Sequence, residues 1–184
     1  VPLAAAPAPI QSVGVQGDHR SYRSLVILSG AGLTPELDTL YKTAKTIPNE
    51  LNFVNRVAYL LNRREVGGTL HSVRSRICRE EADLLREADA IVTSEIMRPM
   101  ADGKCHIAQC FAVLLPVGVG DKFSIAVRAV VTNDFMTAQS AVPGVDFPED
   151  ALANIVRRIE AAGLPVDMIL YDVTGKPPAT VEWE

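Results

Sequence analysis

The sequence has few residues suited to metal binding or disulfide formation. It contains three cysteines and three histidines among 184 residues. Cys105, His106 and Cys110 lie close together, but no other cysteine or histidine has the spacing of a fourth zinc ligand, so we expect no metal site. An odd number of cysteines in a chain of this length is typical of free thiols in a reducing compartment.

Long hydrophobic runs and a basic excess are also missing. No apolar stretch reaches the roughly 18–20 residues that cross a bilayer, and the proline-broken start lacks the basic region of a signal peptide. Lysine and arginine total 18 against 22 aspartate and glutamate, a net charge of −4. We therefore expect a cytoplasmic protein that binds neither membranes nor nucleic acids.

Loops that bind ATP or present a nucleophile are not found in the sequence. There is no Walker-type phosphate loop, no Ser-Gly-Gly-x-Asp-Ser loop, and no Gly-x-Cys-x-Gly or Gly-x-Ser-x-Gly turn. We therefore expect no catalytic residue and no cofactor in this chain. It should instead supply binding groups to a reaction whose centre lies elsewhere.

Hydrophobic periodicity predicts a strand, a helix and a second strand in residues 10–62. An apolar run at residues 25–28 is typical of a strand, and Thr34 marks a helix start. The helix should end at Pro48 and be followed by a strand at residues 54–61. Its apolar face comprises Leu37, Leu40, Tyr41, Ala44 and Ile47.

The same order recurs in residues 109–184. Strands are expected at residues 109–115 and 123–132, followed by a helix that Gly163 ends and a strand at residues 166–171. The apolar positions of this helix, spaced as in the first, are Leu152, Ile155, Val156, Ile159 and Ala162. The repetition indicates an internal duplication, although any two amphipathic helices can share this spacing.

Two further segments complete the chain. Residues 1–9 are rich in proline and alanine and are expected to form a linker. Residues 63–108 form a connecting segment in which an arginine-rich stretch leads into a helix. Its charges suit either a solvated helix surface or an anion-attracting rim. The fold class is therefore expected to be α+β, with two related two-layer units, each a small, mostly antiparallel sheet covered by helices.

Four blocks resemble motifs of one enzyme family, the glutamine-hydrolysing GMP synthases. Residues 12–22 are similar to its Val-Gln-Gly-Asp-x-Arg-(Ser/Thr)-Tyr motif, and residues 171–184 resemble its ending, Lys-Pro-Pro-(Ala/Gly)-Thr-x-Glu-Trp-Glu. Asn55-Arg-Val-Ala-Tyr59 and Asn133-Asp-Phe-Met-Thr137 resemble two further blocks. More than a hundred residues separate the first motif from the last of these blocks, which resembles the long form of the enzyme, with a duplicated C-terminal dimerisation domain.

The resemblance implies that the chain is the C-terminal part of a ligase of purine biosynthesis. The family adenylates xanthosine monophosphate (XMP) with ATP and then aminates it to GMP with ammonia from glutamine. The amidotransferase and ATP-pyrophosphatase domains, with ATP and Mg²⁺, are expected outside this sequence, so the chain alone should be inactive. A second copy of the chain, forming a homodimer, is expected as a further partner. The alternative function is that of a purely structural dimerisation module.

The resemblance also implies four XMP-binding residues: Lys176, Glu182, Arg20 and Gln109. Lys176 precedes two prolines and can present an ammonium to a phosphate, or it is an exposed loop lysine. Arg20 can offer a guanidinium to the nucleotide or form a salt bridge with Asp18. Glu182 can accept hydrogen bonds from ribose hydroxyls or purine N–H groups, and Gln109 matches a nucleotide-contacting glutamine of the long form.

Other residues of the matching blocks have two possible roles. Trp183 either packs the C-terminal end against the core or stacks on the purine base. The block at residues 133–137 contains Asp134, Met136 and Thr137, which can serve structure as well as binding.

Overall fold

The computed structural model describes residues 2–17, 19–33, 35–97, 103 and 106–183. Asp18, Thr34 and Cys105, to which the sequence assigned possible roles, lie outside the described residues. In chain order the elements are β1 (Ala4–Gln16), β2 (His19–Ser29), α1 (Leu37–Glu50), β3 (Val54–Leu60), β4 (His71–Ser72), α2 (Arg79–Met97), β5 (Gln109–Leu115), β6 (Val117–Gly118), β7 (Phe123–Val131), β8 (Gln139–Ser140), α3 (Ala151–Ala161) and β9 (Val166–Asp172).

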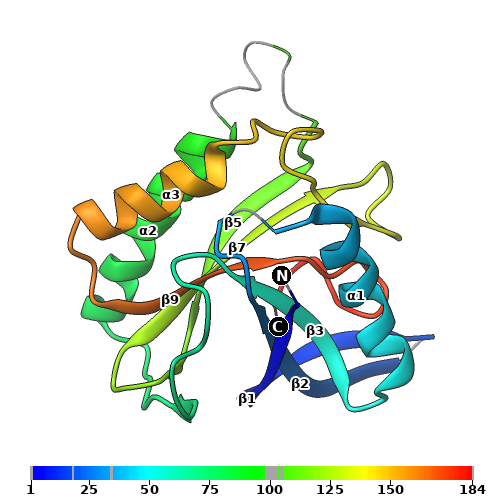
Figure 1. The fold of residues 1–184 in the computed structure, drawn as a ribbon, viewed down its shortest axis with the longest axis horizontal. Helices are drawn as coiled ribbons and strands as arrows, with labels where there is room; N and C mark the ends of the chain where they lie inside the picture. The colour runs from blue at the N-terminus through cyan, green and yellow to red at the C-terminus, as the bar shows by residue number, and fades with distance from the viewer. Residues whose placement is uncertain (1, 18, 34, 98–102, 104–105, 184) are drawn as a thin grey trace.

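Seven of the described strands form one mixed sheet (Figure 1). Its order is β1-β2-β3-β9-β7-β5, and β8 pairs with β7. β1 and β2 are antiparallel and β2 and β3 parallel, and the same directions recur in β5–β7 and β7–β9. The α+β class is confirmed. The two halves share this sheet instead of forming separate sheets, because β3 pairs with β9 and places Tyr59 opposite Tyr171. Their origin by duplication stays a prediction.

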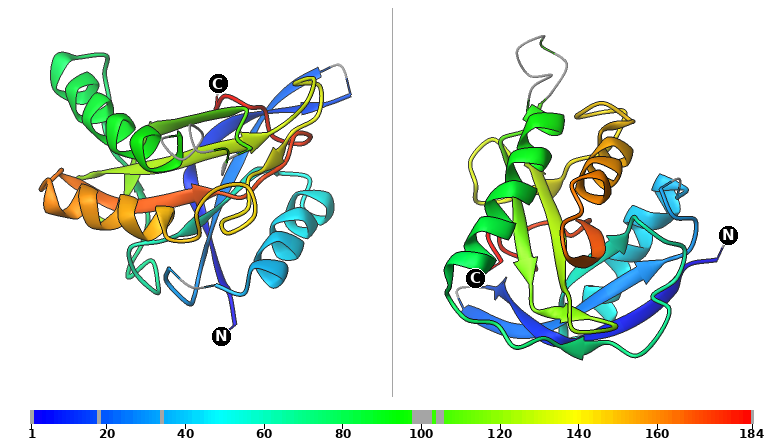
Figure 2. Two further views of the ribbon diagram at one scale, coloured as in Figure 1. Left: turned by 90° about the horizontal axis from the view of Figure 1, so that it is seen from above. Right: turned by 90° about the vertical axis from the view of Figure 1, so that its left-hand side faces the viewer.

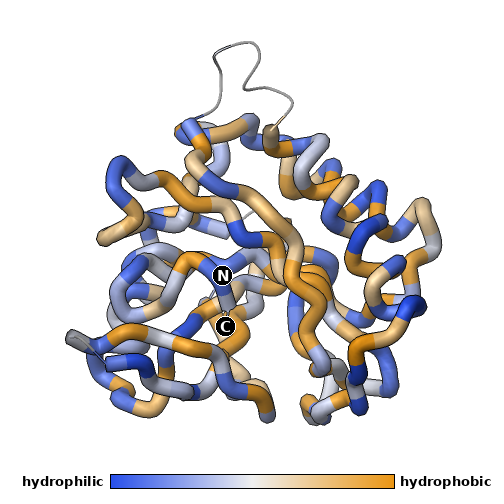
Figure 3. Tube along the Cα trace, turned by 180° about the vertical axis from the view of Figure 1, so that it is seen from behind, coloured by the Kyte–Doolittle hydropathy of each residue, from blue (hydrophilic) through white to orange (hydrophobic). Residues whose placement is uncertain are grey.

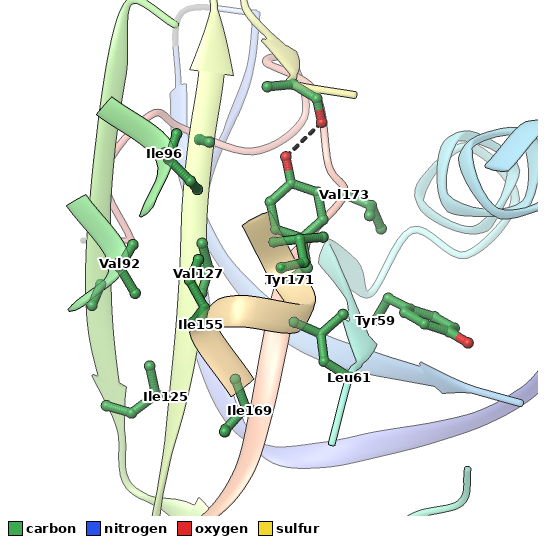
Figure 4. Packing of buried hydrophobic residues seen from close by; sticks show 14 of the residues in the cluster. Tyr59, Leu61, Val92, Ile96, Ile125, Val127, Ile155, Ile169, Tyr171 and Val173 are labelled. Carbon is green, nitrogen blue, oxygen red and sulfur yellow. Dashed lines mark hydrogen bonds between the residues drawn. The ribbon is translucent and has the colours of Figure 1, made fainter. Parts of the chain in front are cut away.

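The helices pack on one face of the curled sheet (Figure 2). α2 contacts β5 and α3, whereas α1 lies against β3. Val92 and Ile96 of α2 and Ile155 of α3 are buried and point toward Val127 and Tyr171 on the strands (Figure 4). Burying such aliphatic side chains contributes roughly 1.5–3 kcal/mol each before the opposing entropy. Of the predicted helical faces, Leu40 and Ala44 in α1 and four residues of α3 are buried, namely Leu152, Ile155, Val156 and Ile159. Ala162 was expected on the second face, but it lies just after α3 and is exposed.

The other face of the sheet is covered by loops and by the C-terminal end. Val66 and Trp183 are buried there against Leu60 and Leu170, and Leu70 packs at the edge of the same cluster. Hydrophobic residues follow the central strands, whereas hydrophobic and hydrophilic residues alternate along the helices (Figure 3). None of the described helices is long and apolar enough to cross a membrane.

The N-terminal segment differs from its prediction. Residues 1–9 were expected to form a linker, but β1 begins at Ala4 and pairs with β2 from there. The register is irregular between Pro7 and Gln11, because proline has no N–H to donate to the ladder. Ala8 is buried, so this segment belongs to the first half of the sheet and not to a flexible connection.

The helix ends depend on where a proline or glycine can be accommodated. Pro48 was expected to end the first helix, but α1 continues to Glu50 and buries Pro48. Helical hydrogen bonding continues past the proline, since the N–H of Leu51 donates to the carbonyl of Ile47 at 2.8 Å. After α3, Gly163 has a φ of 65°, which favours glycine and confirms the predicted end.

Candidate functional site

The residues after β9 form a C-terminal tail, residues 173–183, that turns back along β1. The N–H of Val15 donates to the carbonyl of Pro178 at 2.8 Å, and Gly14 and Ala179 form an isolated bridge. A Cβ atom at Gly14 would lie 2.4 Å from Cγ of Asn55, so only glycine fits at this point of β1. The tail and the β1–β2 hairpin thus lie side by side.

Asn55 of β3 fixes the hairpin that carries Arg20. Its side chain is fully buried, and its amide donates to the carbonyls of Ser12 and Ser21, each at 3.1 Å. Gln16 donates to the Asn55 side-chain oxygen at 2.9 Å. One side chain therefore links both strands of the hairpin to the sheet.

Three charged side chains lie in the core behind the tail. Arg56 of β3, Arg128 of β7 and Asp172 of β9 are all fully buried. Nη1 of Arg56 lies 2.6 Å from Oδ2 of Asp172, and Nη1 of Arg128 lies 3.3 Å from Oδ1 of the same carboxylate. One carboxylate therefore faces two guanidinium groups, and the remaining N–H donors need other acceptors.

The tail provides acceptors for several of them, whereas Nε of Arg56 is buried without a hydrogen-bond partner. Nη2 of Arg56 donates to the hydroxyl of Thr180 at 3.1 Å and to the carbonyl of Glu182 at 2.9 Å. Nη2 of Arg128 donates to the carbonyl of Thr180 at 3.1 Å. The guanidinium of Arg56 also lies 4.5 Å from the ring centroid of Trp183, a cation–π contact. Because Trp183 is only 8% exposed, the structure favours its role as a packing anchor over base stacking.

The charged cluster shifts the pKa values of its members. Burial alone raises the pKa of Asp172, but the charges of Arg128 and Arg56 outweigh it, so the pKa lies below the ordinary value. Burial lowers the pKa of Arg56, which the charge of Asp172 opposes. The carboxylate therefore stays ionised between the two guanidinium groups.

Three of the four predicted site residues lie in one region. Nε2 of Gln109, the first residue of β5, donates to Oε1 of Glu182 at 2.8 Å, although 73 positions separate them. Arg20 and Glu182 line one open cavity of about 770 Å³, together with Phe111 and Trp183. A guanidinium and a carboxylate in one concave surface, with the Gln109 amide hydrogen-bonded to that carboxylate, can bind a molecule with both anionic and N–H groups.

Lys176 lies in a different cavity. Its ammonium donates to the carbonyl of Phe135, and Lys42 and Lys45 of α1 line the same cavity. The structure does not place it with the other three predicted residues. The contact to Phe135 links the tail to the loop between β7 and β8.

The loop between β7 and β8 is ordered by its own side chains. Oδ1 of Asp134 accepts hydrogen bonds from the N–H groups of Met136, at 2.9 Å, and Thr137, at 3.3 Å. The side chain of Met136 is exposed. These contacts support the structural role of the block.

Three residues that support the site were not predicted from the sequence: Arg56, Arg128 and Asp172. A signal was present, because each lies in or directly after an apolar strand, where charged residues are rarely buried unless paired. Within the part of the chain that the structure describes, no group of three histidine, cysteine, aspartate or glutamate side chains is placed to bind a metal ion.

Comparison with known proteins bears on the whole chain. Residues 95–183 match the family described as the GMP synthase C terminal domain. A probable glutamine-hydrolysing GMP synthase of Caenorhabditis elegans is 35% identical over 99% of this chain and 27% of its own length. The Dictyostelium discoideum GMP synthase is 32% identical over 95% of this chain and 26% of its own length. The Treponema denticola GMP synthase is 38% identical over 94% of this chain and 32% of its own length. The chain thus spans about a third or less of these relatives. Residues 95–183 of this chain belong to the GMP synthase C-terminal domain family.

Proposed function

We propose that this chain completes the XMP-binding site of an enzyme that aminates XMP to GMP. The observation that carries the proposal is the hydrogen bond of 2.8 Å between Gln109 and Glu182, beside a cavity that Arg20 also lines. Gln109 begins β5 and Glu182 lies in the C-terminal tail after β9, whereas Arg20 lies in β2 of the first half of the sheet. Such convergence of polar groups in a concave surface is typical of ligand sites.

Each residue has a chemical task in this proposal. The guanidinium of Arg20 binds the phosphate or another anionic group of the nucleotide. The carboxylate of Glu182 accepts hydrogen bonds from ribose hydroxyls or purine N–H groups, and Gln109 orients it. Lys176 binds the phosphate only if its ammonium leaves the carbonyl of Phe135.

The reaction itself is assigned to domains outside this chain. The amidotransferase domain supplies ammonia, and the ATP-pyrophosphatase domain binds ATP and Mg²⁺ and activates XMP, in the cytoplasm. The purified chain should therefore form no GMP from XMP, ATP and ammonia. Turnover by the chain alone would contradict this division of tasks.

Titration of XMP into the ¹⁵N-labelled chain tests the binding role. We expect the amide signals of Arg20, Gln109 and Glu182 to move with a common dissociation constant (Kd). Signals near Arg79, an exposed residue at the start of α2, serve as the control and should not move. Unchanged signals of the three site residues at millimolar XMP would contradict the proposal.

The second candidate function is self-association. β5 is the last strand of the sheet order, and an edge strand can pair with a second copy of the chain. Light scattering distinguishes the states, because the monomer has a mass of 19.9 kDa and a homodimer twice that. A monomer at high concentration would contradict a homodimer formed by this chain alone.

A further inference from the structure

We propose that Arg56 and Arg128 are positioning residues that fix Glu182 for nucleotide binding. The inference rests on the proposed function, because it concerns the same cavity. Neither arginine is among the residues that line the cavity of Arg20 and Glu182. They act on it through the backbone of the C-terminal tail.

The hydrogen bonds of Arg56 define where Glu182 lies. Nη1 of the guanidinium donates to Asp172, and Nη2 donates to the carbonyl of Glu182 at 2.9 Å and to the hydroxyl of Thr180 at 3.1 Å. The Thr180 hydroxyl in turn donates to the carbonyl of Glu182. The planar guanidinium keeps its donors in a fixed geometry, so the Glu182 backbone has a defined position relative to β3 and β9.

Arg128 fixes the residues just before. Its Nη2 donates to the carbonyl of Thr180 at 3.1 Å, and its Nε donates to the carbonyl of Val181 at 3.3 Å. Three consecutive tail carbonyls, from Thr180 to Glu182, therefore accept hydrogen bonds from buried guanidinium groups. With the backbone held on this side, the Glu182 carboxylate lies where Gln109 donates to it at 2.8 Å.

The charge balance couples the tail to the core. Asp172 is one carboxylate for two buried cations, and a buried cation is costly unless its donors are bound. If the tail moved away, the donors that now face Thr180, Val181 and Glu182 would lose their acceptors. Docking of the tail and burial of the arginines therefore stabilise each other.

The chain contains a natural reporter of this state. Trp183 is the only tryptophan in the sequence, and its ring lies 4.5 Å from the guanidinium of Arg56. Measured in the absence of nucleotide, its fluorescence and its accessibility to acrylamide therefore report whether the tail is docked. The side-chain amide signal of Gln109 reports the contact with Glu182.

The test compares three variants of the chain. Arg56→Lys keeps the charge but loses the planar donor set, and Thr180→Val removes one hydroxyl without changing side-chain volume much. Arg63→Lys is the matched control, because Arg63 lies just after β3 and, like Arg56, pairs with an aspartate of β9, at a distance of 2.7 Å from Asp167. Kd for XMP, acrylamide quenching, the Gln109 side-chain signal and far-ultraviolet circular dichroism are measured for each.

We expect Arg56→Lys and Thr180→Val to raise Kd about tenfold, because small displacements of positioned groups weaken binding strongly. Trp183 should become more accessible and the Gln109 side-chain signal should shift, whereas the circular dichroism and the control variant stay unchanged. If Arg56→Lys does not fold, Thr180→Val decides. An unchanged Kd in a folded variant would contradict the positioning role but not the proposed function. Absence of XMP binding by the unaltered chain would contradict the proposed function, and with it this inference.

Discussion

Two arginine–aspartate pairs connect the β3 region to β9, and they differ in burial but hardly in length. Arg56 lies 2.6 Å from Asp172 at one end of β9, and Arg63 lies 2.7 Å from Asp167 at the other. The side chains of the first pair are 0% exposed, whereas those of the second are 31% and 15% exposed. Ion-pair distance alone therefore does not distinguish them, and burial does.

The difference has consequences for what each pair can do. Water and salt screen the Arg63–Asp167 pair, so its contribution to stability should be small. The Arg56–Asp172 pair shares its carboxylate with Arg128, and the surplus positive charge is bound by carbonyls of the C-terminal tail. The buried end of β9 thereby contacts the C-terminal tail through the two arginines, whereas at the exposed end Asp167 pairs with Arg63 and accepts a hydrogen bond from the N–H of Val119 at 2.7 Å.

Replacing the shared carboxylate should have the largest effect. Asp172→Asn leaves two buried guanidinium groups without a counter-charge, and we expect the free energy of unfolding to fall by about 3–5 kcal/mol. Asp167→Asn is the control and should cost about 1 kcal/mol or less. Urea unfolding of both variants measures the difference. Equal losses would remove the distinction between the two pairs.

Acid should weaken the buried pair in a defined pH range. The pKa of Asp172 lies below its ordinary value, because burial raises it but the charges of Arg128 and Arg56 lower it more. Its stabilisation is therefore complete above the unfolded pKa of about 3.9 and is lost as the pH falls through the lower folded pKa. Unfolding measured from neutral pH downwards should show this loss. Asp172→Asn should show less of it, and an unchanged pH dependence in that variant would contradict the assignment.

Removing the aromatic ring over Arg56 should have an intermediate effect. Trp183→Leu keeps an apolar side chain but loses the cation–π contact, and we expect a loss of about 1–2 kcal/mol. Phe53, an exposed aromatic residue before β3, provides the control variant Phe53→Leu, which should be nearly neutral. Thermal and urea unfolding measure both. A neutral Trp183→Leu would show that the tail contributes little to the buried cluster.

The smallest effect is expected at the exposed pair. Arg63→Lys keeps the charge near Asp167, and the free energy of unfolding should change by about 0.5 kcal/mol or less. This change should be smaller still at high salt, which screens the pair. Arg56→Lys under the same conditions is the comparison and should be clearly destabilising. A large effect at Arg63 would contradict the role given to burial.

Local patterns in the sequence predicted much of the fold. The helical faces containing Leu40 and Ile155 are buried as expected, and the expected strand at residues 109–115 is present. Pro48 was misjudged, because a proline in the last turn loses little helix bonding and its ring is buried by packing that the sequence does not reveal. The start of β1 was missed because alanine and proline have low strand propensity.

The candidate site was predictable only in part. Arg20, Gln109 and Glu182 were named by resemblance, and the structure brings them together, although their role in XMP binding stays a prediction. Arg56 and Asp172 were not linked in advance, because 116 positions separate them and their pairing depends on the register of β3 and β9. Long-range strand pairing of this kind is not encoded in local periodicity.

A crystal structure of this chain with XMP would test the central claim most directly. We predict that the nucleotide occupies the cavity of Arg20 and Glu182, with the carboxylate of Glu182 within hydrogen-bonding distance of the ribose or purine and Gln109 still in contact with it. XMP bound only beside Lys176, or no bound XMP at saturating concentration, would contradict the account.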